Sequence, residues 1–264
     1  MKIGVIDGAL AQPWERIFDV AAKIGFEGVE LGVRKDYEDT KLWNARGRLE
    51  LRELSETFNI PIASICLHVY WQISFASPEE SIRRKAADIA RSAAAIASEI
   101  GSKNLLIPLT QSPGIPPEKA RELWIQGIKS CVKSAEDHEV IYALENVNRP
   151  FAKTGEQLAS IVDEINSPFV KVYYDPANAV HAGLNPLDGI GVLRERISQV
   201  HIKDPPGKYL GEGIVDLPSI LKALRDSGYD GWFILETPAT ENPMEAGIRN
   251  LCYLRGVLSG LRVC

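Results

Sequence analysis

The stretch PEKARELWIQGIKSCVKSAEDHEVIYALEN, residues 117–146, decides the fold. Its first part opens with Pro117 and continues with a helical pattern of apolar residues, which predicts an amphipathic helix. Its second part, VIYALEN (140–146), is a short apolar run that predicts a buried strand. This strand ends on Glu145 and Asn146 instead of a turn residue, so the carboxylate is either a satisfied structural acid or a ligand for something charged.

The alternation of short apolar runs with longer amphipathic segments extends over the whole chain. We expect strands at residues 2–6, 28–33, 61–69, 104–109, 140–146, 169–175, 199–204 and 231–236. A β-then-α repeat is typical of a parallel sheet covered by helices. Eight repeats in roughly 250 residues fit a closed (β/α)8 TIM barrel, whereas a doubly wound sheet usually has a glycine-rich turn after its first strand. That turn is absent here, so we predict one TIM-barrel domain over residues 1–264.

The composition narrows the range of partners. The chain is 45% hydrophobic and 25% charged with a net charge of -5, which disfavours a nucleic-acid partner. We expect no membrane span, and the N-terminus MKIGVID enters a strand without the features of an export signal, which predicts a cytoplasmic protein. The four cysteines show no CxxC or zinc-ribbon spacing. The sequence is compatible with a homo-oligomer.

Charged side chains end four consecutive predicted strands. These residues are Glu145 on the fifth, Asp175 on the sixth, His201 on the seventh and Glu236 on the eighth. Because the carboxyl ends of barrel strands converge on one mouth, we expect the four side chains to meet there. The alternation of faces allows both glutamates to point into the barrel, whereas the direction of Asp175 depends on the register of its strand.

Three carboxylates and one imidazole at one rim suit a divalent metal ion. Without a cation, the carboxylates would repel one another and their pKa values would rise. Each residue also has an ordinary structural interpretation: Glu145 as a helix cap or ion-pair partner, Asp175 as a turn residue before a proline, and His201 as a core histidine. Their occurrence at four successive strand ends favours a metal site. The oxygen-rich set suits Mn²⁺, Mg²⁺ or Co²⁺, with Zn²⁺ as a further alternative.

Five motifs in order carry a resemblance to a known family. They are ALEN, YYDPAN, VHIKD, GEGIVD and ILETP, between residues 143 and 238. The chain resembles the sugar phosphate isomerase/epimerase family of xylose isomerase-like barrels, which includes ketose 3-epimerases and hydroxypyruvate isomerases. The resemblance implies that Glu145, Asp175, His201 and Glu236 bind one divalent metal ion, with Mn²⁺ favoured.

The resemblance also implies a reaction on a ketose or a ketose phosphate. A metal bound to the carbonyl and a neighbouring hydroxyl would stabilise an enediolate, after one glutamate has removed a proton. An epimerase returns a proton to the opposite face, and an aldose–ketose isomerase returns it to the adjacent carbon. Glu145 and Glu236 are the expected catalytic acid and base.

Further residues are candidates for substrate contacts. Asn178 stands where many family members have a histidine, a pattern that looks more like the ketose-phosphate 3-epimerase branch. An arginine that free-sugar 3-epimerases place after the seventh-strand histidine has no counterpart, which leaves Lys203 and Lys208 as anchors for an anionic substrate. His68 and Glu30 are expected to line the mouth and bind substrate hydroxyls, Trp71 to form an apolar wall, and Glu212 to orient His201 or Lys203.

Three rival functions stay open. An inosose-type dehydratase would begin with the same proton abstraction and then expel a hydroxyl. A trinuclear-zinc AP endonuclease-like nuclease would need about nine ligands, and the additional histidines it should carry are missing from the expected positions. A non-enzymatic sugar-binding protein would bind no divalent metal and expose an apolar patch instead.

Overall fold

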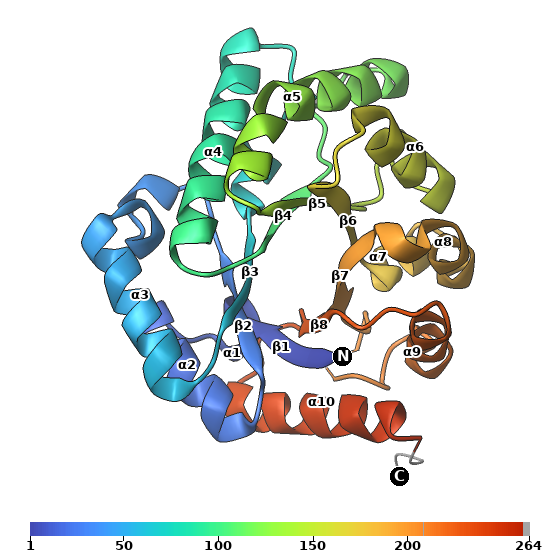
Figure 1. Cartoon of the computed structure of the whole chain (residues 1–264). Helices are drawn as coiled ribbons and strands as arrows, with labels where there is room; N and C mark the ends of the chain where they lie inside the picture. Colours follow the sequence, from blue (N-terminus) through green and yellow to red (C-terminus); the bar gives the residue numbers. More distant parts are fainter. Residues whose placement is uncertain (208, 261–264) are drawn as a thin grey trace.

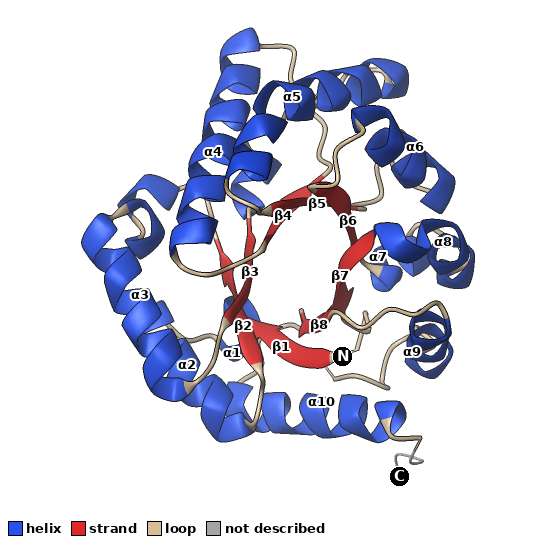
Figure 2. Ribbon diagram, viewed as in Figure 1, coloured by secondary structure: helices blue, strands red, loops and turns tan. Residues whose placement is uncertain are grey.

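Eight parallel strands close into a barrel in the computed structural model, which describes residues 1–207 and 209–260 (Figures 1 and 2). The strands are β1 Lys2–Ile6, β2 Gly28–Gly32, β3 Ile62–Cys66, β4 Asn104–Pro108, β5 Ile141–Glu145, β6 Val170–Tyr174, β7 Ile197–Ile202 and β8 Trp232–Leu235. Each strand pairs with the next in the sequence, and β1 pairs with β8 to complete the cylinder. The predicted TIM barrel is therefore confirmed.

Helices surround the barrel and connect its strands (Figure 2). They are α1 Asp7–Leu10, α2 Trp14–Ile24, α3 Ala45–Phe58, α4 Glu80–Glu99, α5 Pro117–Asp137, α6 Gly155–Ile165, α7 Pro176–His181, α8 Pro186–Leu193, α9 Leu217–Asp226 and α10 Pro243–Leu258. Short 3₁₀ turns are η1 Tyr37–Asp39, η2 Lys41–Trp43, η3 His68–Trp71 and η4 Arg194–Arg196. No helix in the described part of the chain is long and apolar enough to cross a membrane.

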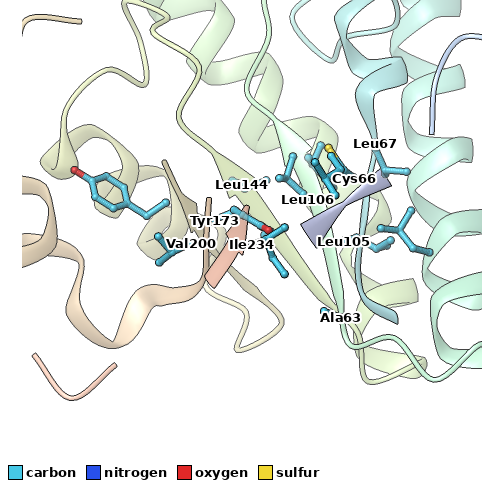
Figure 3. Packing of buried hydrophobic residues seen from close by; sticks show 14 of the residues in the cluster. Ala63, Cys66, Leu67, Leu105, Leu106, Leu144, Tyr173, Val200 and Ile234 are labelled. Carbon is cyan, nitrogen blue, oxygen red and sulfur yellow. The ribbon is translucent and has the colours of Figure 1, made fainter. Parts of the chain in front are cut away.

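The strands are almost continuously apolar because both of their faces are buried, one by the helices and the other by the barrel interior. Tyr142 of β5 points outward, since its hydroxyl donates to the Ala90 carbonyl of α4. Ala143 and Glu145 therefore face inward. Figure 3 shows Leu144, Tyr173 and Ile234 among the buried side chains of the core.

Close packing inside the barrel fixes which residue types fit there. A Cβ atom on Gly4 would lie 2.6 Å from the Ile234 Cδ1 atom and 3.1 Å from the Gly28 carbonyl oxygen, so a larger residue at this point of β1 would displace Ile234. The sheet also contains two register shifts, at Val29/Glu30 between β2 and β3 and at Val172/Tyr173 between β6 and β7. These shifts set the height at which the side chains of opposite strands meet across the barrel.

The strand ends differ from the predicted ranges by a few residues. Pro108 ends β4, as expected for a residue that cannot donate in a ladder. β3 stops at Cys66, and His68 lies in η3 instead of in the strand. Glu145 is the last residue of β5, Asp175 and Glu236 directly follow β6 and β8, and His201 is the penultimate residue of β7.

Candidate metal centre and active site

Four side chains from successive strands converge at the carboxyl end of the barrel. Glu145, Asp175, His201 and Glu236 each offer one ligand atom, and these atoms all lie within 4.8 Å of one another. Glu145, Asp175 and His201 are buried, whereas Glu236 is partly exposed at the mouth. The chain thus brings together all four residues that the strand-end pattern selects.

The orientations of Tyr173 and Tyr174 at the end of β6 show where the Asp175 side chain points. Tyr174 points outward, where its hydroxyl donates to the Pro186 carbonyl, while Tyr173 points into the barrel, where its hydroxyl donates to Glu30. Asp175 shares the face of Tyr173 and therefore points inward. Its Oδ1 atom accepts the backbone N–H of Asn178 at 2.9 Å, so Asp175 also caps α7.

Asn146 and Asn178 hold this corner of the site together. The Asn146 amide donates to the Asp175 carbonyl and accepts the Asp175 backbone N–H, both at 2.8 Å. The side chain of Asn178 donates to the Asn146 carbonyl, also at 2.8 Å. Asn178 is therefore engaged in fixing the ends of β5 and β6, a role that differs from the expected substrate contact. The sequence reasoning left Asn146 without a role, although it directly follows Glu145.

Glu30 lies beneath the cluster and orients its histidine. Its Oε1 atom lies 2.8 Å from His201 Nε2, and its Oε2 atom accepts hydrogen bonds from Ser64 at 2.5 Å and Tyr173 at 2.9 Å. Glu30 is completely buried, so its carboxylate does not line the mouth as the sequence interpretation expected. A carboxylate that accepts from Nε2–H leaves Nδ1 as the ligand atom. Nδ1 indeed faces Glu145 at 3.2 Å and Glu236 at 3.3 Å.

Lys203 reaches into the same cluster from the end of β7. Its Nζ atom lies 2.7 Å from Asp175 Oδ2 and 2.7 Å from Glu236 Oε2. Burial by itself would lower the pKa of Lys203, but Asp175 and Glu236 outweigh it and raise that pKa. The ammonium group is therefore committed to two of the four candidate ligands and offsets part of their negative charge.

The four groups perturb one another's protonation. Burial raises the pKa of Glu145 to about 7, against a smaller lowering by His201. Burial would also raise the pKa of Glu236, but His201 and Lys203 lower it below its usual range. His201 is desolvated, which lowers its pKa, but Glu236 and Glu30 outweigh that effect and raise it. The two glutamates thus sit in environments that separate their pKa values, as is typical of an acid and base pair.

The donor set fits a divalent cation. Three carboxylates, Glu145, Asp175 and Glu236, are crowded here, and the single ammonium of Lys203 is shared between Asp175 Oδ2 and Glu236 Oε2. Buried carboxylates that outnumber the cations beside them are unfavourable unless a further cation binds. Three carboxylates and one imidazole nitrogen match the preferences of hard and borderline dications.

Asp204 organises the rim loop that follows β7. Its buried carboxylate accepts the backbone N–H groups of Gly211 at 2.8 Å, Gly213 at 2.9 Å and Val215 at 2.9 Å. A Cβ atom on Gly213 would lie 2.1 Å from the Asp204 carbonyl oxygen, which explains the glycine. Glu212 lies between these anchored positions, is exposed and pairs with Arg249 at 2.5 Å.

Glu212 therefore does not orient His201 or Lys203. The loop backbone wraps around Asp204 and turns the Glu212 side chain outward toward α10. Glu30 orients His201 instead. Lys203 is held by Asp175 and Glu236. The second predicted anchor, Lys208, lies outside the described residues.

His68 and Trp71 both lie in η3, directly beyond β3. The His68 Nε2 atom is 3.4 Å from Cys66 Sγ, and burial lowers the pKa of His68. Trp71 is 49% exposed, and the Arg149 guanidinium lies over its ring at 5.4 Å from the centroid. Trp71 is thus available at the rim, whereas sequence reasoning did not identify its partner Arg149.

Comparison with known proteins supports this description of the fold. The chain is 27% identical to the L-ribulose-5-phosphate 3-epimerase UlaE of Escherichia coli (strain SMS-3-5) over 255 residues, which cover 89% of this chain and 87% of UlaE. It is also 27% identical to UlaE of Salmonella typhimurium over 267 residues, which cover 92% of this chain and 90% of that UlaE.

Solved structures of sugar epimerases share the barrel. The structure of L-ribulose 3-epimerase superposes with a TM-score of 0.86 at 15% identity, over 98% of this chain and 95% of that one. The structure of D-allulose 3-epimerase from Methylomonas sp. superposes with a TM-score of 0.84 at 20% identity, over 98% of each chain. The model of the xylose isomerase-like TIM barrel family matches residues 18–254, which is most of the sequence. The chain therefore belongs to the xylose isomerase-like TIM barrel family.

Proposed function

We propose that this protein is a metal-dependent 3-epimerase of a ketose or a ketose phosphate. The observation that carries the proposal is the convergence of Glu145, Asp175, His201 and Glu236 within 4.8 Å at the mouth of the barrel. The curated relatives that cover most of the chain are L-ribulose-5-phosphate 3-epimerases, which agrees with this chemistry. We assign one divalent cation, with Mn²⁺ favoured, to the four residues.

Glu145 and Glu236 supply the acid and the base. One oxygen of each approaches His201 Nδ1, whereas the second carboxylate oxygen of each forms no hydrogen bond to the described residues. The second oxygens are therefore free to exchange a proton with a substrate carbon. One glutamate breaks the C3–H bond and takes the proton, and the electron pair moves toward the C2 carbonyl to give an enediolate.

Inversion requires the second glutamate to donate a proton to the opposite face of C3. Without a bound metal, burial raises the pKa of Glu145, and His201 and Lys203 lower the pKa of Glu236, so the surroundings of the two carboxyl groups give them different proton affinities. A bound dication would polarise the substrate carbonyl and stabilise the developing negative charge. Asp175 and His201 hold the site without a direct role in proton transfer.

The alternative nuclease function requires more metal ligands than this site has. Within residues 1–207 and 209–260, the cluster at the mouth is the one group of three or more histidine, cysteine, aspartate or glutamate side chains close enough to share an ion. A trinuclear centre would need additional groups around it. The geometry therefore favours chemistry at a single ion.

Solvent exchange tests the proposal directly. Mn²⁺-loaded protein is incubated in D₂O with a panel of ketoses and ketose phosphates, and the labelled carbon is located by NMR. We expect label at C3 together with the 3-epimer, and no exchange after chelation of the metal. Label at C1 or C2 would indicate an aldose–ketose isomerase, and loss of water would indicate a dehydratase. Absence of any reaction across the panel would contradict the proposal.

A further inference from the structure

Cationic side chains near the mouth are mostly committed to carboxylates. Arg34 follows β2, and its Nη2 atom lies 3.3 Å from Asp7 Oδ1. Lys203 follows β7 and contacts both Asp175 and Glu236. Arg149 follows β5, four residues after Glu145, and forms no ion pair with any described residue. Its positive charge is therefore not neutralised by the part of the chain that the structure describes.

Arg149 is also unusual among the arginines in its hydrogen bonding. The other half-buried arginines all donate to oxygen atoms: Arg48 to Glu99, Arg83 to Ser77 and Pro78, Arg121 to Ser160, and Arg196 to Asp163. The guanidinium of Arg149 donates to no described residue, and its Nε atom is buried without an acceptor. A buried N–H group without an acceptor costs free energy, and a ligand that supplies an acceptor to the Nε–H group recovers it.

Trp71 holds the guanidinium in place at the rim. The Arg149 guanidinium carbon lies 5.4 Å from the centroid of the Trp71 ring, within the range of a cation–π contact. Trp71 ends η3 beyond β3, and Arg149 lies beyond β5, so the pair spans the end of β4 on the side of the barrel that carries the metal cluster. The contact restrains the position of the guanidinium before any ligand arrives.

We propose that Arg149, stacked on Trp71, binds the phosphate group of the substrate, so that the enzyme acts on ketose phosphates in preference to free ketoses. A planar guanidinium with several free donors recognises phosphate through paired hydrogen bonds. The metal cluster then holds the carbonyl end of the sugar, and Arg149 holds the phosphate end. This inference rests on the proposed epimerase function, and Arg149 lies four residues beyond Glu145, the site residue that ends β5.

The commitment of Lys203 strengthens this assignment. The sequence interpretation named Lys203 and Lys208 as anion anchors, but the Lys203 ammonium lies 2.7 Å from each of two carboxylate oxygens. Moving it to a phosphate would leave Asp175 and Glu236 without that partner, which costs free energy at a buried site. Within residues 1–207 and 209–260, Arg149 has no ion pair that anion binding would break.

The test compares Arg149→Ala with Arg225→Ala, which removes the same charge from an exposed position on α9. Deuterium incorporation at C3 is measured for a ketose phosphate and for the corresponding free ketose. We expect the wild type to prefer the phosphorylated sugar, and Arg149→Ala to lose about ten- to hundredfold in kcat/KM on it, mostly through KM. The loss on the free ketose should be at least tenfold smaller, and Arg225→Ala should match the wild type.

A binding measurement separates this inference from the proposed function. Inorganic phosphate is titrated into the metal-free proteins and followed by ³¹P NMR, a readout that needs no turnover. We expect at least about tenfold weaker binding by Arg149→Ala, and an intermediate affinity for Arg149→Lys, which keeps the charge but not the fork of donors. Circular dichroism verifies that each variant is folded.

The two experiments separate failure of the epimerase proposal from failure of the Arg149 assignment. If no sugar exchanges its C3 hydrogen but phosphate binding depends on Arg149, the epimerase proposal fails and the anion site stands. If C3 exchange occurs but the free ketose is used as well as its phosphate, or if Arg149→Ala retains the KM and the phosphate affinity of the wild type, the assignment of Arg149 is overturned while the epimerase proposal stands.

Discussion

The two halves of the barrel rim differ in charge. Strands β5–β8 lead to Glu145, Asp175, His201 and Glu236, whose ligand atoms lie close enough to share a cation. On the β1–β4 side, Asp7 after β1 and Arg34 after β2 pair with each other, and β3 and β4 end in the uncharged Cys66 and Pro108. The charged half, β5–β8, nevertheless depends on the other half, because Glu30 of β2 crosses the interior to His201 of β7.

We expect the largest loss of activity when one of the catalytic carboxylates in the charged half is neutralised. Glu145→Gln and Glu236→Gln each keep the shape of the side chain but remove a proton acceptor, so we expect each to abolish C3 exchange, by about a thousandfold or more. Deuterium incorporation in the presence of saturating Mn²⁺ is the measurement. Glu164→Gln, at an exposed ion pair with Arg121, is the control and should retain activity. Full activity in either glutamate variant would remove that residue from proton transfer.

The link between the halves is tested at Glu30. Glu30→Gln weakens the acceptor for His201 Nε2–H, and we expect Mn²⁺ affinity to fall about ten- to hundredfold, as for other residues that orient a metal ligand. Affinity is measured by competition with a chelator, independently of turnover. Glu27→Gln is the matched control, because Glu27 lies before β2 at the opposite end of the barrel and accepts only the Ile3 N–H among the described groups. Equal affinities for Glu30→Gln and the wild type would show that the two halves act independently.

Acid should weaken metal binding by the charged half. Glu145, whose pKa burial raises to about 7, and His201, whose pKa Glu236 and Glu30 raise, must both lose a proton before they can bind a metal. We therefore expect Mn²⁺ affinity to fall as the pH falls from 8 to 6, by roughly tenfold per pH unit for each proton displaced. Electron paramagnetic resonance of free Mn²⁺ measures the affinity. An affinity that is constant over this range would contradict the proton competition.

The metal cluster was predictable because its geometry follows from the strand ends. Four consecutive strands deliver a ligand to the same mouth, and a parallel barrel brings those ends together whatever the details of its loops. The alternation of faces along β5 was equally local: Tyr142 points out to α4, which places Glu145 inward. Only Asp175 needed the register of its strand to settle its direction.

The supporting residues were not predictable from local patterns. Glu30 was expected at the mouth, but the packing of β2 against the barrel interior places its carboxylate under His201, a residue 171 positions away in the sequence. Ser64 and Tyr173 donate to Glu30, but nothing in the sequence around either residue indicated that contact. Glu212 was expected near His201, but the folding of its loop around Asp204 sends it to Arg249 instead.

The sequence by itself determined the number and order of the strands, the closure into a barrel and the set of charged residues at the mouth. These features depend on short-range periodicity and on where each strand stops, which neighbouring residues encode. The tertiary structure alone decided the contacts of Glu30 with His201, of Lys203 with two carboxylates, and of Arg149 with Trp71. Such contacts depend on strand register and loop paths, which are set by the packing of the whole barrel and leave no mark on the adjacent sequence.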